Sequence, residues 1–517
     1  MLGIIGLFLW ISTGTFKVDQ PKMEITKNEA IHIANKALKD YGFEPDSQWT
    51  METRHNSWEG QNDRFVWQEH GKNTYYKLRG KYLGVPAWQI RYRKYSGEVA
   101  QRAEQISCYV NPTGEKTSIR HMLPETRDGG ILNEEEARAL VLDYVLNKYS
   151  IEVNMLDELE AKSSKKPNRV DWNFIFEDVT TFKLDEGKLQ ISVNISGNKV
   201  TGSNRYVFVP EEWKRQEEEK KSRWNPVQII LGLVKTFSIA FILMFGAIRW
   251  TKKEFNVKLF LQAFVFLLII GSIDLWSDMP NLFYQFKTEI PYGDQLYQMV
   301  LTSIVGLLFG SLFKAIMLSA SQSMIHHFMP NAKDKTRIIF GIFLGIFLIG
   351  LYSTLNSLYP TLGPKLGYWW PLNDRITLWG QVFNSLSSFI SVFIDMLSIV
   401  LCFSYITQNM TKRLPLGGFY IFLIGLSITS QNRGAVEMIH IWVIATIIFT
   451  GLYLILHKEI LRFYPKLIPI TAGTITVVSN LTLGFPNLYN GQLLGACIGS
   501  TFVALFAYYC YKSVENG

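Results

Sequence analysis

Cysteine is scarce in this chain, and its placement excludes several kinds of site. The 517 residues include four cysteines, and Cys108 is the only one in the polar N-terminal region. This usage provides no disulfide framework and no Cys/His spacing typical of zinc sites. The histidines of the same region, His32, His55, His70 and His121, also lack ligand spacing.

A phosphate-binding loop is missing as well. No Gly-x-x-x-x-Gly-Lys-Ser/Thr motif occurs in the sequence, so any ATPase that served this protein would have to be a separate chain. The net charge of +8 could indicate a nucleic-acid partner. Such a partner requires basic residues gathered on one soluble face, and they are not so gathered. We therefore expect no nucleic-acid partner.

Long apolar runs dominate the chain after residue 225. A helix needs about 20 mostly apolar residues to span a bilayer. The candidate spans are 226–248, 259–276, 297–318, 338–357, 379–406, 416–430, 438–456, 467–485 and 491–511. With the apolar N-terminus, the sequence predicts a polytopic α-helical membrane protein of about 9–10 transmembrane helices, with the lipid bilayer as a partner. The 416–430 span is short enough to be a half-helix or a re-entrant turn.

The basic residues of the connecting segments predict an orientation. Lys and Arg gather in alternate segments, namely 249–258, 326–337, 409–415, 457–466 and the C-terminal tail. The opposite loops hold only Lys287, Lys365, Arg375 and Arg433. Because basic loops stay in the cytoplasm, we expect residues 20–224 to be extracytoplasmic and the C-terminus to be cytoplasmic.

The N-terminal segment 1–15 is apolar like the core of a signal peptide. It lacks a basic start and an Ala-x-Ala cleavage site, both of which cleaved signals carry. We interpret it as an uncleaved membrane anchor, with a cleaved signal peptide as the alternative.

Residues 20–125 and 126–212 predict two similar α+β units, followed by a charged juxtamembrane linker at 213–225 and a membrane domain at 226–511. Each unit opens with a capped amphipathic helix, TKNEAIHIANKALKDYG and NEEEARALVLDYVLNKYS, the first with a Thr26–Glu29 capping box. The expected strand-like stretches are TYYKLRG, AWQIRYRK and ISCYVNPTGEK, the last with Pro-Thr-Gly as a turn, in the first unit and DWNFIFED, KLQISVNISGNKV and RYVFVP in the second. The tetrapeptide SGNK predicts a hairpin turn.

A few ionisable residues fall within or at the ends of the predicted spans. Asp395 lies near the centre of 379–406, where an ionisable side chain is a functional candidate by default. Lys235 and Lys314 are assigned to positions nearer the cytoplasmic ends, from which they can snorkel to the interface. Glu437 and His440 begin the 438–456 span with i, i+3 spacing, which puts them on one helix face.

Asp395, Glu437 and His440 are thus the candidate site residues. Zinc takes three or four N, O or S ligands, but only Asp395 lies at depth, so we expect no metal and no other cofactor. The structural alternative is that Asp395 hydrogen-bonds within the bundle to Asn384, Ser387, Ser388 or Ser398. Gly341 and Gly345 form a Gly-x-x-x-Gly motif that favours close helix packing.

Four segments ahead of the polytopic part carry a resemblance to a known family: ITKNEAIHIANKAL, NEEEARALVLDYV, KKPNRVDWNFIFE and YVFVPEEWKR. Through them the chain resembles the CPBP, or Abi, intramembrane proteases of bacteria, which are related to the type II CAAX prenyl endopeptidases. It is most similar to the large members with a paired PepSY-like extracytoplasmic region. The resemblance implies two PepSY-like units and a location in the bacterial cell membrane.

The family motifs are degenerate in this chain. The family has Glu-Glu-x-x-x-Arg in one span, Phe-x-x-x-His in the next, and a later His followed by Asn or Asp, which activate water either through a metal or as general bases. The first motif falls at Ile394–Ile399, where only Asp395 remains as an acid. The histidine positions fall on Ser430 or Gln431 and on Gly473.

The resemblance therefore implies a catalytically silent relative that binds a peptide or membrane-protein partner, with bacteriocin maturation or immunity as a possible setting. One alternative is an active, divergent intramembrane endopeptidase that uses Asp395, Glu437 and His440, with zinc if a metal is involved. Another alternative is a permease-like subunit whose Asp395 faces a water-filled pathway. The sequence therefore leaves open whether the protein is an enzyme, and it favours a catalytically silent protein.

Overall fold

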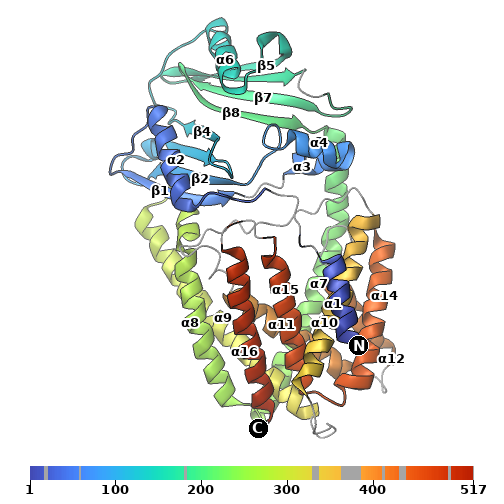
Figure 1. The fold of residues 1–517 in the computed structure, drawn as a ribbon. Helices are drawn as coiled ribbons and strands as arrows, with labels where there is room; N and C mark the ends of the chain where they lie inside the picture. The colour runs from blue at the N-terminus through green and yellow to red at the C-terminus, as the bar shows by residue number, and fades with distance from the viewer. Residues whose placement is uncertain are drawn as a thin grey trace.

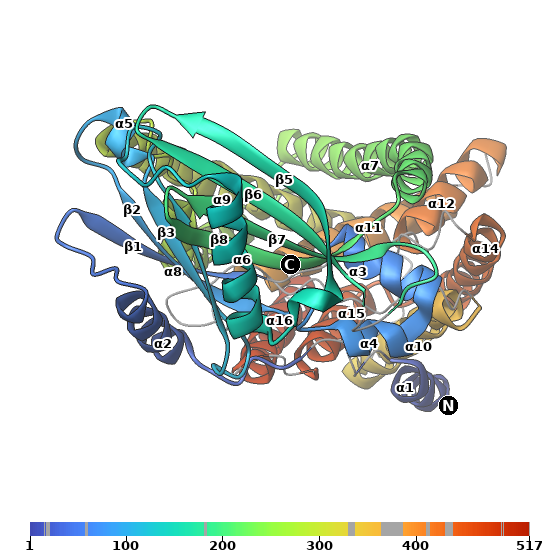
Figure 2. The same ribbon diagram turned by 90° about the horizontal axis from the view of Figure 1, so that it is seen from above.

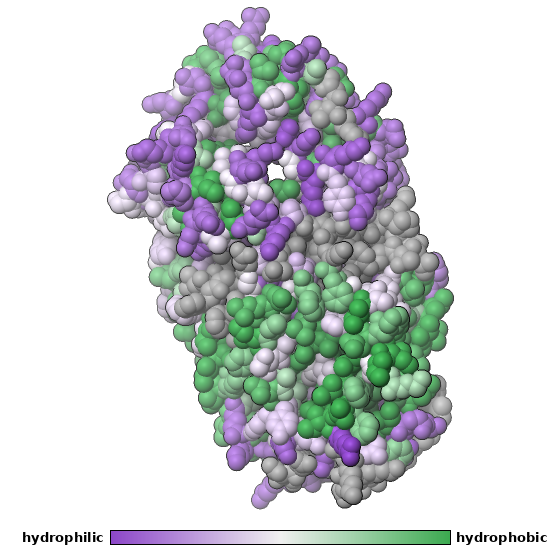
Figure 3. Space-filling view, in the orientation of Figure 1, coloured by the Kyte–Doolittle hydropathy of each residue, from purple (hydrophilic) through white to green (hydrophobic). Residues whose placement is uncertain are grey.

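The computed structural model describes residues 1–14, 16, 21–56, 60–179, 183–328, 337–362, 386–409, 414–429, 438–486, 489 and 491–515. An α+β region sits on one end of a helical bundle (Figure 1). On the face shown in Figure 3, apolar side chains predominate on the bundle, and polar side chains are frequent on the α+β region and at the opposite end of the bundle. We call that opposite end the distal end.

The first sheet is a four-stranded antiparallel meander, ordered β1-β2-β3-β4. Its strands are β1 (Trp49–Asn56), β2 (Ala87–Lys94), β3 (Gln105–Val110) and β4 (Thr117–Met122), with the short helix α5 (Val99–Arg102) before β3. Helix α2 (Lys27–Asp40) packs Ala30, Ala34 and Leu38 against Ile90 and Ile106. The predicted capping box is confirmed, because the Thr26 amide donates to Glu29 Oε2 at 2.7 Å and the Thr26 side chain accepts from the Glu29 amide.

A helical insertion separates β1 from β2. It consists of α3 (Gln61–Phe65), the π-helical turn η1 (Val66–His70) and α4 (Gly71–Leu78). The prediction of a strand at TYYKLRG is wrong, because α4 occupies most of that segment. Tyr75 and Leu78 are both buried while Tyr76 is exposed, which fits one face of a helix and not the alternation of a strand.

The second sheet is also an antiparallel meander, ordered β5-β6-β7-β8. Its strands are β5 (Leu156–Lys166), β6 (Arg169–Asp178), β7 (Lys188–Ser196) and β8 (Lys199–Phe208), preceded by the short η2 (Val153–Met155). Helix α6 (Glu134–Tyr149) lies across this sheet (Figure 2) and buries Ala137, Val141 and Val145 against it. The SGNK turn is confirmed, with Ser196 paired to Lys199 and Gly197 at φ 64°.

Within the described residues, ten apolar helices build the bundle. Eight are long and apolar enough to cross a membrane: α7 (Glu211–Thr251), α8 (Val257–Tyr284), α9 (Tyr292–Phe328), α10 (Ile338–Leu362), α11 (Leu386–Asn409), α14 (Ile439–Leu456, continued by η6, His457–Leu461), α15 (Leu467–Gly484) and α16 (Gln492–Glu515). Two shorter ones are α1 (Leu2–Thr13) and α12 (Leu414–Thr429). Each coincides with a predicted span or with the apolar N-terminus, so the prediction of a multi-pass membrane protein is confirmed.

The charged linker at 213–225 is not a separate element. It is the first part of α7, which runs unbroken from the second sheet through the bundle (Figure 1). Trp213 is buried against the core of the second unit, and Glu217 pairs with Arg64 of α3 at 3.2 Å. A continuous helix, with Pro226 inside it, therefore joins the outer region to the membrane part.

Glycines bring several helices into close contact. Helix α1 packs along α10 so tightly that a Cβ on Gly350 would lie 2.1 Å from the Gly6 carbonyl oxygen. Gly341 and Gly345 pack against α15, where added Cβ atoms would lie within 3 Å of Ile470 and Thr474. The close packing expected of the Gly-x-x-x-Gly motif is confirmed, and α1 is part of the bundle.

Candidate functional site

Asp395 lies on α11, the central helix of the bundle, and faces two lysines. Lys314 of α9 forms an ion pair with Asp395 Oδ1. The Nζ atom of Lys235, on α7, lies 3.8 Å from Asp395 Oδ2. Three helices that are distant in sequence thus bring two ammonium groups to one carboxylate. We call these three residues the Lys–Asp–Lys cluster.

This cluster lies near the middle of the bundle. On α7, Lys235 stands between Arg223 towards the outer region and Arg249 towards the distal end. At 1.5 Å per residue, these arginines are about 18 Å and about 21 Å away along the helix. The expectation that Lys235 and Lys314 snorkel to an interface is therefore wrong, because both side chains turn to Asp395 instead.

The lysines also replace the expected hydroxyl partner of Asp395. Ser398 donates to the Ile394 carbonyl at 2.8 Å and lies 3.3 Å from the Ser321 hydroxyl, so its hydrogen bonds are used elsewhere. The side chains of Asn384 and Ser387 lie outside the described residues. A carboxylate within an apolar bundle needs compensation of its charge, which two cations supply better than a serine.

The other candidate site residues do not join Asp395. His440 is exposed at the start of α14, and Glu437 lies outside the described residues. Within the described ranges, no group of three or more His, Cys, Asp or Glu side chains could hold a metal ion. The described residues thus do not show a single site formed by Asp395, Glu437 and His440.

The positions assigned to the family histidines are only partly described. Ser430 and Gln431 lie outside the described residues, whereas Gly473 is buried in α15. A Cβ on Gly473 would lie 2.4 Å from the Cβ of Ala507 on α16. This glycine therefore serves close helix packing and leaves no room for an imidazole.

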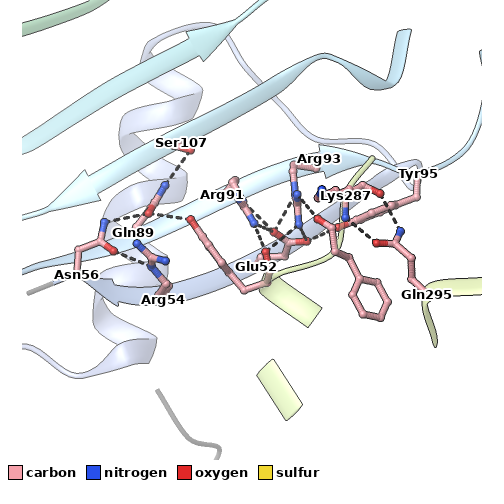
Figure 4. Close-up of polar contacts among 12 residues, drawn as sticks. Glu52, Arg54, Asn56, Gln89, Arg91, Arg93, Tyr95, Ser107, Lys287 and Gln295 are labelled. Carbon is pink, nitrogen blue, oxygen red and sulfur yellow. Dashed lines mark hydrogen bonds and ion pairs between the residues drawn. The ribbon is translucent and has the colours of Figure 1, made fainter. Parts of the chain in front are cut away.

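A second polar cluster, which the sequence analysis missed, joins the outer region to the bundle (Figure 4). Glu52 on β1 accepts from Arg91 at 2.7 Å and from Arg93 at 2.6 Å, both on β2. Arg93 also donates to the Phe286 carbonyl at 2.5 Å and to the Tyr284 carbonyl at 3.2 Å, at the end of α8. Cations favour the C-terminal carbonyls of a helix. We call Glu52, Arg91 and Arg93 the anchor cluster.

Tyr284 is the residue of α8 that the anchor cluster holds most closely. The Arg91 guanidinium carbon lies 3.6 Å from the centroid of the Tyr284 ring, and the Tyr284 hydroxyl donates to Gln89 Oε1 at 2.9 Å. Tyr95 donates to Glu52 at 2.7 Å. Burial and this hydrogen bond raise the pKa of Tyr95 above its ordinary value. All these groups are paired, so the geometry indicates a structural joint without reactive groups.

A sequence signal for the anchor cluster existed. Arg91 and Arg93 alternate within AWQIRYRK, so both point to one face of β2, and Arg91 stands opposite Glu52 in the sheet register. The register was not predictable, because β1 was not among the expected strands.

Comparison with protein-family models, curated proteins and solved structures finds no match to this chain.

Proposed function

We propose that this chain is a catalytically silent membrane protein of the bacterial cell membrane that binds a peptide or membrane-protein partner. The observation that carries the proposal is the engagement of Asp395 by Lys314 and Lys235. A general base needs a lone pair directed at the water that it activates. Here the carboxylate oxygens face ammonium groups.

The proposed scaffold is that of the CPBP proteins, with two PepSY-like units outside the membrane. Its support is the order of the elements: a short apolar helix, two units that each place a helix before a four-stranded sheet, and then a polytopic bundle. The resemblance suggests a small secreted peptide, in bacteriocin maturation or immunity, as the setting of the partner.

A peptidase assay tests directly whether the protein lacks catalytic activity. Full-length protein in nanodiscs is incubated with a library of quenched fluorescent peptides, with and without added zinc, beside an Asp395→Asn variant. We expect background hydrolysis in every sample. Hydrolysis that disappears in Asp395→Asn while the variant remains folded would overturn the proposal and establish the endopeptidase alternative.

The permease-like alternative rests on the same cluster, because ionisable groups at this depth mark ion and substrate pathways in many transporters. Its test is an ion flux measured in proteoliposomes. A flux that depends on Asp395 favours the permease-like subunit, whereas its absence favours the binding scaffold.

We further propose that the α+β region faces away from the cytoplasm. The support is the placement of Arg249, Lys258, Lys458 and Arg462 at the distal end of the bundle. A Cys497→Ser background removes the exposed native cysteine, and single cysteines are then placed at the exposed positions Lys162 and Lys458. An impermeant maleimide should label only Lys162→Cys in intact cells. Labelling of Lys458→Cys alone would show that the orientation is the opposite of the proposed one.

A further inference from the structure

We propose that the faces of α7 and α9 around Lys235 dock a transmembrane segment of another protein that carries one carboxylate at mid-membrane depth. The inference rests on the proposed function, since it gives the membrane-protein partner a docking site and a chemistry. Its basis is the unequal pairing of the two lysines together with the open surface beside them.

The charges of the Lys–Asp–Lys cluster do not balance. Two ammonium groups face one carboxylate, so one positive charge remains. Lys314 pairs closely with Asp395, whereas Lys235 lies 3.8 Å from it and its side chain is 53% exposed. An ammonium group that is only loosely paired and partly exposed at this depth is costly. A second carboxylate arriving from the lipid side would offset that cost.

Helices α7 and α9 pack together in the distal part, below this cluster. There, a Cβ on Gly246 would lie 2.7 Å from the Cβ of Ala320, and Arg249 is hydrogen-bonded to His327 at 2.6 Å. Towards the outer region the helices part. The outer end of α9 adjoins that of α8, and the outer end of α7 lies across the bundle (Figures 1 and 2).

The surfaces exposed by this separation are apolar and open. Cβ atoms on Gly232 of α7 and on Gly306 and Gly310 of α9 would meet nothing within 4 Å. An open, apolar stretch of the α9 surface is formed by Phe309, Gly310, Leu312, Phe313 and Ile316. Gly306, Gly310 and Lys314 recur every four residues, so they share one face of α9.

The depth of Lys235 and the open apolar surface beside it together favour a transmembrane helix over other anionic ligands. A lipid phosphate stays at the headgroup level, about 15 Å from the middle of the hydrocarbon core. A carboxylate on a transmembrane helix can lie at the middle of the membrane because the helix backbone holds it there. Small residues such as Gly306 and Gly310 let such a helix approach closely. Charge complementarity at Lys235 and the open apolar surface beside it thus point to the same occupant.

The direct test uses a defined probe, a 21-residue Leu/Ala transmembrane peptide with one central Glu, and a matched peptide with Gln at that position. Binding to full-length protein in nanodiscs is followed by energy transfer. We expect the Glu peptide to bind about tenfold more tightly. The preference should disappear in Lys235→Met and persist in Lys235→Arg, and Gly310→Leu should weaken both peptides. Equal binding of the two peptides, or a preference unchanged in Lys235→Met, would overturn the docking site.

A cellular experiment separates this inference from the proposed function. A photo-reactive residue at Leu233, which is 49% exposed on α7, is compared with one at Ile447 on α14, 57% exposed. Adducts at Leu233 that vanish in Lys235→Met support the docking site. Adducts confined to Ile447 overturn the site and leave the binding function intact, and an adduct of twice the chain's mass identifies a second copy as the occupant instead. Absence of adducts at both positions counts against the binding function itself.

Discussion

Arg93 and Glu52 meet in a two-point ion pair, with Arg93 Nη2 2.6 Å from one carboxylate oxygen of Glu52 and Arg93 Nε 3.0 Å from the other. The side chains are only 7% and 4% exposed. The same guanidinium donates to the carbonyls at the end of α8, so the Arg93 side chain connects the first sheet to the bundle. With the continuous α7, this gives the outer region two attachments to the membrane part.

Removing the charge of Glu52 should therefore loosen the joint. Glu52→Gln leaves the buried guanidinium of Arg93 and the half-buried one of Arg91 without their carboxylate, and breaking a buried pair in this way typically costs about 3–5 kcal/mol. We expect a lower unfolding midpoint in detergent and faster hydrogen exchange at residues 284–295. The matched control is Glu158→Gln, whose pair with Arg138 is 30% exposed on both sides and should cost no more than about 1 kcal/mol. Equal effects of the two variants would refute the joint.

The Lys–Asp–Lys cluster predicts that a substitution on α9 recovers part of the stability lost by a substitution on α11. Asp395→Asn leaves two lysines without a counter-charge inside the bundle, and we expect a loss of stability of about 3–5 kcal/mol. Adding Lys314→Met removes the closer cation and should recover part of that loss. The measurement is a double-mutant cycle of unfolding midpoints for the full chain in one detergent. Additive effects of the two substitutions would mean that the ion pair does not form.

Close packing of α1 on α10 predicts a steric effect. Gly350→Leu places a side chain where a Cβ alone would lie 2.1 Å from the Gly6 carbonyl oxygen. We expect α1 to separate from α10, so that a cysteine pair at Thr13 and Ser353, whose hydroxyls lie 3.1 Å apart, cross-links less. Gly451→Leu is the control, because its Cβ would meet nothing within 4 Å. Retained cross-linking in Gly350→Leu would show that the helices do not pack this closely.

Hydropathy was sufficient to place the membrane helices, because a bilayer demands long apolar runs whatever the fold. The outer strands were harder to recognise. β1 (WTMETRHN) and β5 (LDELEAKSSKK) are rich in polar residues, and TYYKLRG has strand-forming residues but folds mostly as a helix, with the Tyr75 ring packed against Trp67. Asp395 stood out because it is isolated among apolar residues. Its lysine partners lie 81 and 160 positions away in the sequence, so only the packing of α7, α9 and α11 reveals them.

The pairing of Glu104 predicts how stability depends on pH. Burial opposes ionisation of Glu104, but the hydrogen bond from His121 at 3.2 Å and the charges of Arg127, His121 and Lys94 outweigh it and hold its pKa below the ordinary 4.5. A carboxyl whose pKa is lower in the folded state stabilises the fold above the unfolded pKa. That contribution is lost as the pH falls through the folded pKa.

We therefore expect the full chain to lose stability as the pH falls below about 4.5, and Glu104→Gln to lose less over the same interval because it has no proton to take up there. At neutral pH the variant should be the less stable of the two. Unfolding midpoints measured across the pH range provide the test, with Glu135→Gln, an exposed carboxylate of α6, as the control that should follow the parent chain. A Glu104→Gln profile that falls in parallel with the parent would assign the acid sensitivity to other carboxylates.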